Sequence, residues 1–485
     1  MKQYILRYIA LLVSWPVFAM SAMAQGEIMS MSLQQSIDYA LENNKNIQNA
    51  RFDAYIAEAR TKEVLSAGLP QVSASADLQY FVELPTQILP GEFSPQSGVF
   101  NIGDQTFLGT LLQEDPNNPG ELTVIPGQPI EAQFGFPWNS TAGISINQLV
   151  ADGTFFLGLK AAKTFVDLQS IAANRTREDI AYEVSKAYYS ALLAQEQLNL
   201  LDANIGRLLK LFEETKVLNQ NGFVEKIDVD RLQISYTNLQ LERDRVARIG
   251  QLSRDLLKFQ MGMPVDKVVE LTESIDALGE RPEALLNMDG INAESRIEFD
   301  LLKTQLALEE YNQKRFNMGY LPSLYAFGSY QFNAQRNSFN FLDSNERWFP
   351  ISVVGLQLNV PIFDGLRKHQ QIQQSKLEQL KIRNNMEIFR NSIRLELRKN
   401  AGDVVNAYNN LQSLERNKQL AQRVFDVSTI KYREGVGSSL ELNDSESQLK
   451  EAESNYLSGL FQYLISRVEL SKAKGEFSQY HDKNE

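Results

Sequence analysis

The stretch IAYEVSKAYYSALLAQEQLNLLDANIGRLLKLF, residues 180–212, decides the fold. Its apolar residues alternate spacings of four and three without a miss: Ile180, Val184, Ala187, Ala191, Ala194, Leu198, Leu201, Ile205, Leu208 and Phe212. This spacing is the seam of a coiled coil. The helix that carries the seam is expected to run from Gly153 to about Leu218, a length of roughly 100 Å at 1.5 Å per residue.

A second long helix is expected from Gly365 to Tyr432, with a less strict heptad pattern. Turns are predicted at Gly222 and Gly435, because glycine commonly ends a helix in the left-handed region. Helices of about half the length return along residues 227–259 and 440–472, and two shorter helical patterns cover residues 32–66 and 292–317.

The element order occurs twice along the chain. Pro70 and Pro322 each end a helical pattern and start an alternating one, since proline stops a helix and is tolerated at the first residue of a strand. Asp152 and Asp364 each precede a glycine between a strand and a long helix, 212 residues apart, and an aspartate there caps free backbone donors. We therefore predict a tandem repeat, with a signal peptide at 1–24, a first repeat at 25–265 and a second at 266–485.

Each repeat contains two strands of alternating polarity, about ten residues long, as in tilted membrane strands. The apolar positions are Val72, Ala74, Ala76, Leu78, Tyr80 and Val82; Ala142, Ile144 and Ile146; Leu324, Ala326, Tyr330 and Phe332; and Val354, Leu356, Leu358 and Val360. A soluble sheet with one wet face has the same alternation. The signal peptide and the long helices favour the membrane.

Three other segments are expected to lack regular structure. Residues 84–137 hold eight of the fifteen prolines and are predicted to form an irregular external loop. Residues 261–290 are predicted to be an irregular connector between the repeats. The polar tail after Gly475 is predicted to be loose, with His481 and His369 solvated.

Composition sets the compartment and excludes several classes of protein. Lys2 and Arg7 precede an apolar stretch and the Ala22-Met23-Ala24 cleavage pattern, so export is expected, and removal of the two basic residues changes the net charge from −12 to −14. An acidic surface argues against a nucleic-acid partner. No segment after the signal has some 18 consecutive apolar residues, so only a closed β-barrel would cross a bilayer.

Four strands per chain do not close a barrel, so several copies must pool their strands. Two copies would give eight strands, whose interior fills with side chains, whereas three copies leave a lumen. The predicted fold class is a mixed α+β membrane protein: a trimeric 12-stranded β-barrel, with four strands per protomer, continued by a long periplasmic α-helical coiled-coil tunnel.

The duplicated plan, the joints at Pro70 and Pro322, the stretch from Pro361 to Gly365, and Tyr432-Arg433-Glu434-Gly435 together resemble the TolC-like outer membrane efflux protein family. The resemblance spans nearly the whole mature chain. It implies a homotrimer in the outer membrane of a Gram-negative bacterium, with a periplasmic extension that docks with an inner-membrane pump through a periplasmic adaptor, or membrane fusion protein. The implied function is a passive exit duct for efflux or type I secretion.

The tip of the helices, around Gly222 and Gly435, is where a gate is expected. Glu441 and Asp444 lie three residues apart on one helical face, so a trimer would present two acidic rings that attract cations. Ser438 and Glu441 also fit a capping box, and that alternative stays open. The resemblance makes Asp228 and Tyr432 candidates for the contacts that close the tip. Since the expected basic partner is replaced by Gly437, Lys226 or Arg433 is the predicted substitute.

An enzyme is not expected, because a chain with two histidines and no cysteine has little material for a metal site or a catalytic triad. No cofactor is predicted either. Two other classes fit the rods and strands: a trimeric surface stalk or adhesin, and a periplasmic helical scaffold. Adhesins usually keep their membrane strands at one terminus, whereas here the strands interrupt the helices twice.

Overall fold

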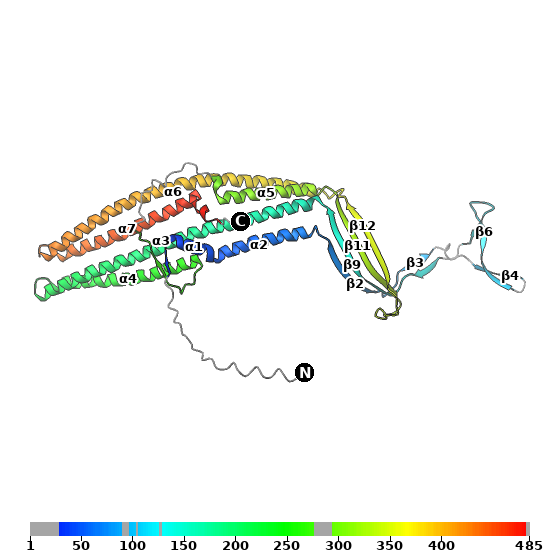
Figure 1. Cartoon of the computed structure of the whole chain (residues 1–485), viewed down its shortest axis with the longest axis horizontal. Helices are drawn as coiled ribbons and strands as arrows, with labels where there is room; N and C mark the ends of the chain where they lie inside the picture. The colour runs from blue at the N-terminus through cyan, green and yellow to red at the C-terminus, as the bar shows by residue number, and fades with distance from the viewer. Residues whose placement is uncertain (1–28, 90–96, 103–104, 126–128, 276–292, 482–485) are drawn as a thin grey trace, which may run out of the picture. The chain divides into compact units, whose positions relative to one another are not determined.

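Two helices of nearly equal length dominate the chain (Figure 1). They are α3, Gly153–Gln220, with 68 residues, and α6, Arg367–Arg433, with 67 residues. A glycine turn follows each, and the chain returns in α4, Lys226–Met261, and α7, Ser439–Lys474, each 36 residues long. The predicted long and returning helices are therefore present, with ends shifted by one or two residues.

The computed structural model describes residues 29–89, 97–102, 105–125, 129–275 and 293–481. The predicted signal peptide, 1–24, lies outside the described residues. None of the described helices has the length and hydropathy needed to cross a membrane.

The helix predicted over 32–66 is two helices, α1, Leu33–Asn43, and α2, Lys45–Ser66. The break is at Asn44, whose backbone is extended and whose amide donates a hydrogen bond to the carbonyl oxygen of Gln260 at 2.7 Å. The Asn44 side-chain oxygen also accepts from the backbone N–H of Asn46 at 2.8 Å, so one asparagine ends α1 and starts α2. The shorter helix of the second half is α5, Ile297–Met318, preceded by the single turn η4, Ala293–Ser295.

Four antiparallel strands form one sheet in the order β12-β11-β9-β2. The strands are β2, Gln71–Tyr80; β9, Trp138–Ala151; β11, Ser323–Arg336; and β12, Phe349–Asn359. β2 and β12 are the edges, and neither has a second partner strand among the described residues. All four predicted strands are present, and together they make a single sheet.

The prediction of an irregular loop over 84–137 was wrong. This segment contains three antiparallel strand pairs: β3, Thr86–Leu89, with β8, Ile130–Gln133; β4, Ser97–Ile102, with β5, Gln105–Thr110; and β6, Leu112–Glu114, with β7, Leu122–Val124. The prolines of this segment that the structure describes, Pro85, Pro116, Pro119, Pro129 and Pro137, all lie outside the strands, where no ladder donor is needed. The proline content therefore marks the turns of this segment and not a lack of structure.

Two more segments are more regular than predicted. Within the connector, β10, Val269–Leu271, pairs in parallel with β1, Met29–Met31, while residues 276–292 lie outside the described residues. After α7, a short 3-10 helix, η5, Glu476–Tyr480, is packed, and Phe477 is buried. The prediction of a loose tail was therefore wrong for the residues up to His481. Phe477 packs into the core, although the composition of the tail as a whole is polar.

The chain divides into two compact units. A helical unit comprises Met1–Ala59, Lys163–Glu309 and Leu377–Glu485, and a sheet unit comprises Arg60–Ala162 and Glu310–Lys376. Each unit takes segments from both halves of the chain. The predicted repeats at 25–265 and 266–485 divide the chain by sequence position and not by compact unit, so this division stays a prediction.

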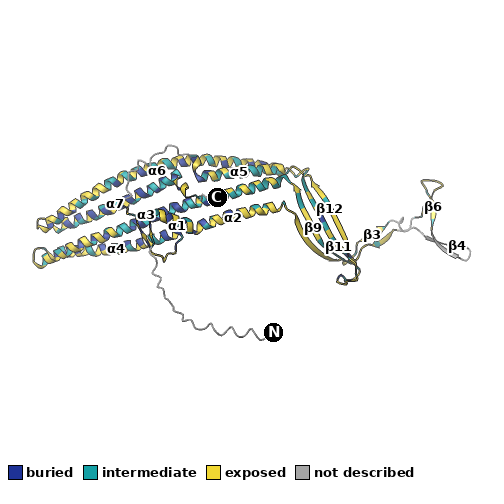
Figure 2. Ribbon diagram, viewed as in Figure 1, coloured by how far each residue is buried: buried dark blue, intermediate teal, exposed yellow. Residues whose placement is uncertain are grey.

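The core of the helical unit follows the predicted seam (Figure 2). Ile180, Val184, Ala187, Ala191, Ala194, Leu201 and Leu208 are buried, and Leu198, Ile205 and Phe212 are half-buried. Tyr188 and Tyr463 are the largest fully buried side chains, and the Tyr188 hydroxyl donates to the Met31 carbonyl oxygen at 3.2 Å.

Candidate functional site

The strand register brings the alternating positions of all four strands into rows. Val72 lies opposite Ile146, Ile146 opposite Gly328, and Gly328 opposite Val354. Because side chains alternate between the faces of a sheet, the even-numbered positions of these strands lie on one face, except at the end of β9, where the register shifts between Leu149 and Ala151. That face, here called the apolar face, holds Val72, Ala74, Ala76, Leu78, Tyr80, Ala142, Ile144, Ile146, Leu324, Ala326, Tyr330, Phe332, Val354, Leu356 and Leu358.

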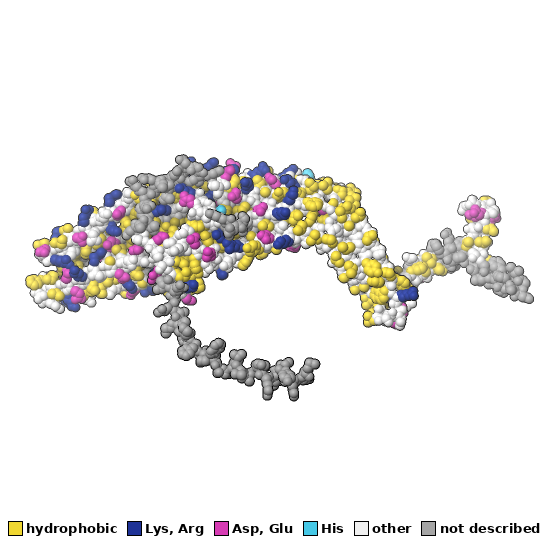
Figure 3. Space-filling view, viewed as in Figure 1, with side chains coloured by type: hydrophobic (Ala, Val, Ile, Leu, Met, Phe, Trp, Pro, Cys, Tyr) yellow, Lys and Arg dark blue, Asp and Glu magenta, His cyan; other side chains and the backbone are white. Residues whose placement is uncertain are grey.

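The apolar face is exposed in the single chain. Val354 is 88% exposed and Leu356 is 71% exposed, and Figure 3 shows hydrophobic side chains gathered over the sheet. Near one end of the strands, the centre of the Tyr80 ring lies 4.7 Å from that of Trp138 with the rings tilted by 45°, and the Trp138 ring lies 5.2 Å from that of Phe339. An exposed apolar surface of this extent marks a lipid or protein interface, and aromatic residues at strand ends are typical of membrane strands.

The opposite face of the sheet is more polar. It carries Gln71, Asp77 and Asn147, and the hydroxyl oxygens of Ser73 and Ser145 are hydrogen-bonded at 2.8 Å. This face also carries Phe327, whose ring covers Gly355 of the neighbouring strand. The two faces therefore differ in polarity, as a wall between lipid and water requires.

The predicted strand–helix joints differ in detail. Pro70 and Pro322 each stand immediately before a strand, β2 and β11. Asp152 caps α3, since its Oδ1 accepts from the backbone N–H of Thr154 at 2.6 Å. Asp364 instead contacts Lys368, both the backbone N–H at 3.2 Å and Nζ at 3.0 Å, because positive φ angles at Gly365 and Leu366 delay the start of α6.

Both predicted turns, at Gly222 and Gly435, have positive φ angles, +79° and +77°. Each is followed by a backbone bond that closes the helix end: Phe223 N–H donates to Leu218 at 2.9 Å, and Val436 N–H donates to Lys431 at 3.0 Å. This is the glycine-terminated helix end expected from the sequence. Within the helical unit the two hairpins turn at the same end (Figure 1).

Asp228 lies where the two hairpins meet. It accepts a hydrogen bond from the hydroxyl of Ser439, the first residue of α7. Arg231, one turn along α4, places Nη1 at 3.6 Å from Asp228 Oδ1 and 3.3 Å from the Ser439 hydroxyl. Asp228, Arg231 and Ser439, here called the tip cluster, join α4 to α7.

Neither predicted substitute base contacts Asp228. Lys226 pairs with Asp230 at 3.2 Å, and Arg433 pairs with Glu214 at 2.9 Å. Arg231 was missed, although its position three residues after Asp228 on one helix is a sequence signal for an ion pair.

Tyr432 is buried, and its hydroxyl contacts Thr215 Oγ1 at 3.4 Å, so it joins α6 to α3. Burial, together with the nearby charge of Asp228, raises the pKa of Tyr432 above its usual value, against the opposing effect of the Thr215 hydrogen bond. Both Tyr432 and Asp228 therefore stand at contacts between the two hairpins, through different partners.

The two gate candidates, Glu441 and Asp444, are exposed. The Glu441 carboxylate accepts from Lys431 Nζ at 3.0 Å, and its backbone N–H donates to the Ser438 hydroxyl at 3.1 Å. Asp444 accepts from Gln448 Nε2 at 2.8 Å. The serine half of the capping box is thus present, and the carboxylates are also accessible, so the acidic ring remains a prediction.

Sequence reasoning missed a buried polar cluster between α3 and α7. Glu453 is 6% exposed and accepts from Asn204 Nδ2 at 3.0 Å, with Arg207 Nη2 at 3.2 Å. Lys450 pairs with Glu242 of α4. Long-range pairs of this kind have no local sequence signal, because their members lie more than 200 residues apart.

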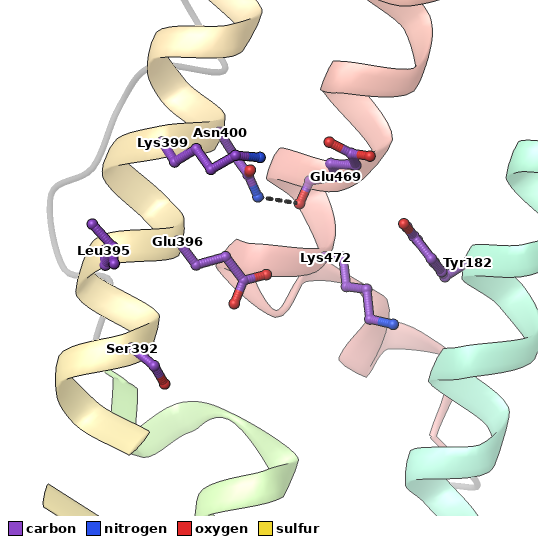
Figure 4. Close-up of a pocket in the computed structure, with 8 residues that line it drawn as sticks. All are labelled: Tyr182, Ser392, Leu395, Glu396, Lys399, Asn400, Glu469 and Lys472. Carbon is purple, nitrogen blue, oxygen red and sulfur yellow. Dashed lines mark hydrogen bonds between the residues drawn. The ribbon is translucent and has the colours of Figure 1, made fainter. Parts of the chain in front are cut away.

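A hollow of about 460 Å³ in the helical unit is open to solvent, and most of the residues that line it are polar or charged (Figure 4). Its walls come from α3, α6 and α7, and the Asn400 amide donates to the Glu469 carbonyl oxygen at 3.2 Å. Lys472 lies 4.1 Å from the centre of the Tyr182 ring and pairs with Asp179 at 3.0 Å. In the part of the chain that the structure describes, no group of three or more acidic or histidine side chains is arranged to hold a metal. His369 is exposed on α6.

Known proteins share this arrangement. Residues 299–476 match the family model described as outer membrane efflux protein. The outer membrane protein TolC of Vibrio cholerae is 21% identical over 349 residues, which cover 70% of this chain and 77% of that protein. The chain is a relative of the TolC-like outer membrane efflux proteins. The cobalt-zinc-cadmium resistance protein CzcC of Cupriavidus metallidurans is 23% identical over 326 residues, covering 65% of this chain and 72% of that protein.

The fold has the same relatives. The crystal structure of the Campylobacter jejuni CmeC outer membrane channel superposes with a TM-score of 0.64 at 15% identity, covering 93% of this chain and 90% of that chain. The predicted resemblance is therefore confirmed, and these similarities indicate an outer-membrane location. Since the relatives are TolC-type channels, the chain is not an enzyme.

Proposed function

We propose that three copies of this chain close their sheets into one barrel of twelve strands and form the outer-membrane exit duct of an efflux or secretion system. The observation that carries the proposal is the exposed apolar face, to which all four strands contribute. In lipid this face is favourable, whereas in water it is an aggregation hazard.

The edges of the sheet support closure by identical neighbours. β2 and β12 each leave one side of their backbone without a strand partner among the described residues. Hydrocarbon does not satisfy free backbone groups, so β2 of one copy must pair with β12 of the next for the wall to be complete. Three copies are the smallest number that leave a lumen.

The helical hairpins are proposed to line a periplasmic tunnel that is shut at rest. The tip cluster and the Tyr432–Thr215 contact hold the two hairpins of one chain together at the end where both turn. Glu441 and Asp444 would form the acidic rings at this entrance. Contact with a periplasmic adaptor and an inner-membrane pump would then release the tip.

Cell fractionation followed by unheated gel electrophoresis tests the assembly. The proposal expects the protein in the outer-membrane fraction as a species three times the chain mass that dissociates on heating. A soluble periplasmic protein of single-chain mass would refute it and favour the helical scaffold. Co-purification of a cross-linked inner-membrane partner tests the pump, and a surface-exposed trimer with no such partner would favour the stalk.

A further inference from the structure

The last described residues, 475–481, contact three helices of the helical unit. α7 ends at Gly475, whose φ of +79° turns the chain out of the helix into residues 475–481, here called the C-terminal strap. The carbonyl oxygen of Tyr480 accepts from Arg177 Nε of α3 at 2.7 Å, and the Tyr480 hydroxyl donates to Gln34 of α1 at 3.1 Å. The strap therefore connects α7 to α3 and α1.

The C-terminal strap packs beside a small cavity. Phe477 is buried, with its ring 6.2 Å from that of Tyr182 and 6.0 Å from that of Tyr480. A cavity of about 170 Å³ lies beside it, lined by Leu33, Ile37, Tyr189, Arg467, Phe477 and Tyr480 among others. A segment that covers a cavity through one apolar anchor and a few polar contacts opens at a lower cost than a core helix.

The last described residue of the strap supplies an ionisable contact. His481 Nε2 is hydrogen-bonded to the carboxylate of Glu178, a residue of α3 that is 6% exposed. Burial raises the pKa of Glu178, while the contact with His481 opposes that rise. The cost of burying this carboxylate in its charged form is thus offset by the imidazole.

Other charged groups act on the pair, and Glu178 is influenced by Arg296 and Glu298 in particular. Arg296 donates to Glu298 at 2.9 Å and to the Ala473 carbonyl oxygen at 3.0 Å, at the end of α7. Further ionisable groups on the packed elements include Arg175, Arg177 and Asp179 of α3, Lys472 and Lys474 of α7, and Glu476 and Tyr480 of the strap. These groups are paired with one another or with backbone, apart from their weaker long-range effects.

We propose that His481 and Glu178 form a pH-dependent latch, which holds the C-terminal strap at mildly acidic pH and weakens as the medium becomes alkaline. Imidazole side chains generally lose their proton between about pH 5 and 8. Once His481 is neutral, the buried Glu178 carboxylate has lost its counter-charge, so departure of the strap, which returns the carboxylate to water, becomes more favourable.

Hydrogen exchange read by mass spectrometry tests the latch on the full chain in detergent. After correction for intrinsic exchange rates, protection of residues 475–481 is expected to fall about tenfold between about pH 6 and about pH 8.5. In His481→Gln the protection of this peptide becomes independent of pH. Glu178→Gln keeps a polar group of the same size at this position, and it is expected to remove the pH dependence as well.

The second histidine provides a matched control. His369 is exposed on α6, so His369→Gln is expected to exchange like the wild type. Protection of the buried segment 184–194 of α3 reports that each variant is folded. Equal strap protection at both pH values in the wild type, or unchanged pH dependence in His481→Gln, would overturn the proposal.

Discussion

Ser439 donates a hydrogen bond from its hydroxyl to the carboxylate of Asp228, and so joins the start of α7 to the first turn of α4. Arg231 contacts both side chains. The two residues are 211 positions apart, and they come from the two hairpins that turn at one end of the helical unit. Their contact makes the tip a shared structure of both hairpins.

Loosening the tip cluster is expected to open the tip. Ser439→Ala and Arg231→Gln each remove one contact of Asp228, and a partly exposed hydrogen bond of this kind contributes about 1 kcal/mol, or a several-fold change in a two-state equilibrium. Either variant should raise the basal conductance in single-channel recordings several-fold. Lys226→Gln, whose exposed pair with Asp230 lies outside the cluster, is the control and should leave the conductance unchanged. Equal conductance in all three variants and the wild type would contradict this role.

The acidic rings are tested by their effect on cations. Glu441→Gln combined with Asp444→Asn is expected to weaken block by divalent cations, because neutral side chains attract them less at a narrow entrance. Glu415→Gln, an exposed site on α6, should keep the wild-type block. If the double variant is blocked at the same cation concentration as the wild type, the two carboxylates do not form a cation-binding entrance and serve only at the start of α7.

Adjacent valines on β12 separate the two faces of the sheet. Val354 is on the apolar face, and Val353 is on the opposite face. A lysine facing lipid near the middle of a membrane strand costs about 2–4 kcal/mol, whereas a lysine facing a wet lumen is tolerated. Val354→Lys should therefore lower the temperature at which the assembly dissociates on a gel, and Val353→Lys should change it little. The reverse order would assign the faces the other way round.

The buried polar cluster is expected to stabilise the helical unit. Glu453→Ala leaves Asn204 without its acceptor and Arg207 without its counter-charge, at a cost of about 1–3 kcal/mol after allowance for the partial exposure of Arg207. Thermal unfolding followed by the helical circular dichroism signal measures the loss. Glu451→Ala, exposed on the same helix, serves as the control, and an equal loss there would show that the cluster has no special effect.

Periodic patterns predicted the parts of the fold that repeat along the chain. The seam from Ile180 to Phe212 predicts which side of α3 is buried, because its spacing matches the helical period. The alternation in β2 predicts which side chains share one face of the sheet, because its spacing matches the period of a strand. The turns at Gly222 and Gly435 were also predicted from the sequence. The break of the first helix at Asn44 was not predicted, because it depends on a hydrogen bond to Gln260, far along the chain.

The predictions for residues 84–137 and for the tail after Gly475 were wrong for the same reason. Amino-acid composition indicates which residues tend to contact solvent, but it does not indicate which strands pair or which side chain is buried. The strands within 84–137 are short and interrupted by prolines, so no alternation long enough to recognise was present. Phe477 alone anchors a tail that is otherwise polar. At the tip, Asp228 was predicted as a contact residue but Arg231 was not, because the bases considered were Lys226, two residues before Asp228, and Arg433, and not the residue three positions after Asp228 on α4.

Conductance of the purified protein across a planar lipid bilayer, recorded on material whose mass in detergent has been measured, tests the central claim most directly. The account predicts a species of three chains that inserts and opens discrete conductance steps, because only neighbouring copies complete the sheet. A single chain that stays folded in detergent and leaves the bilayer insulating would contradict it.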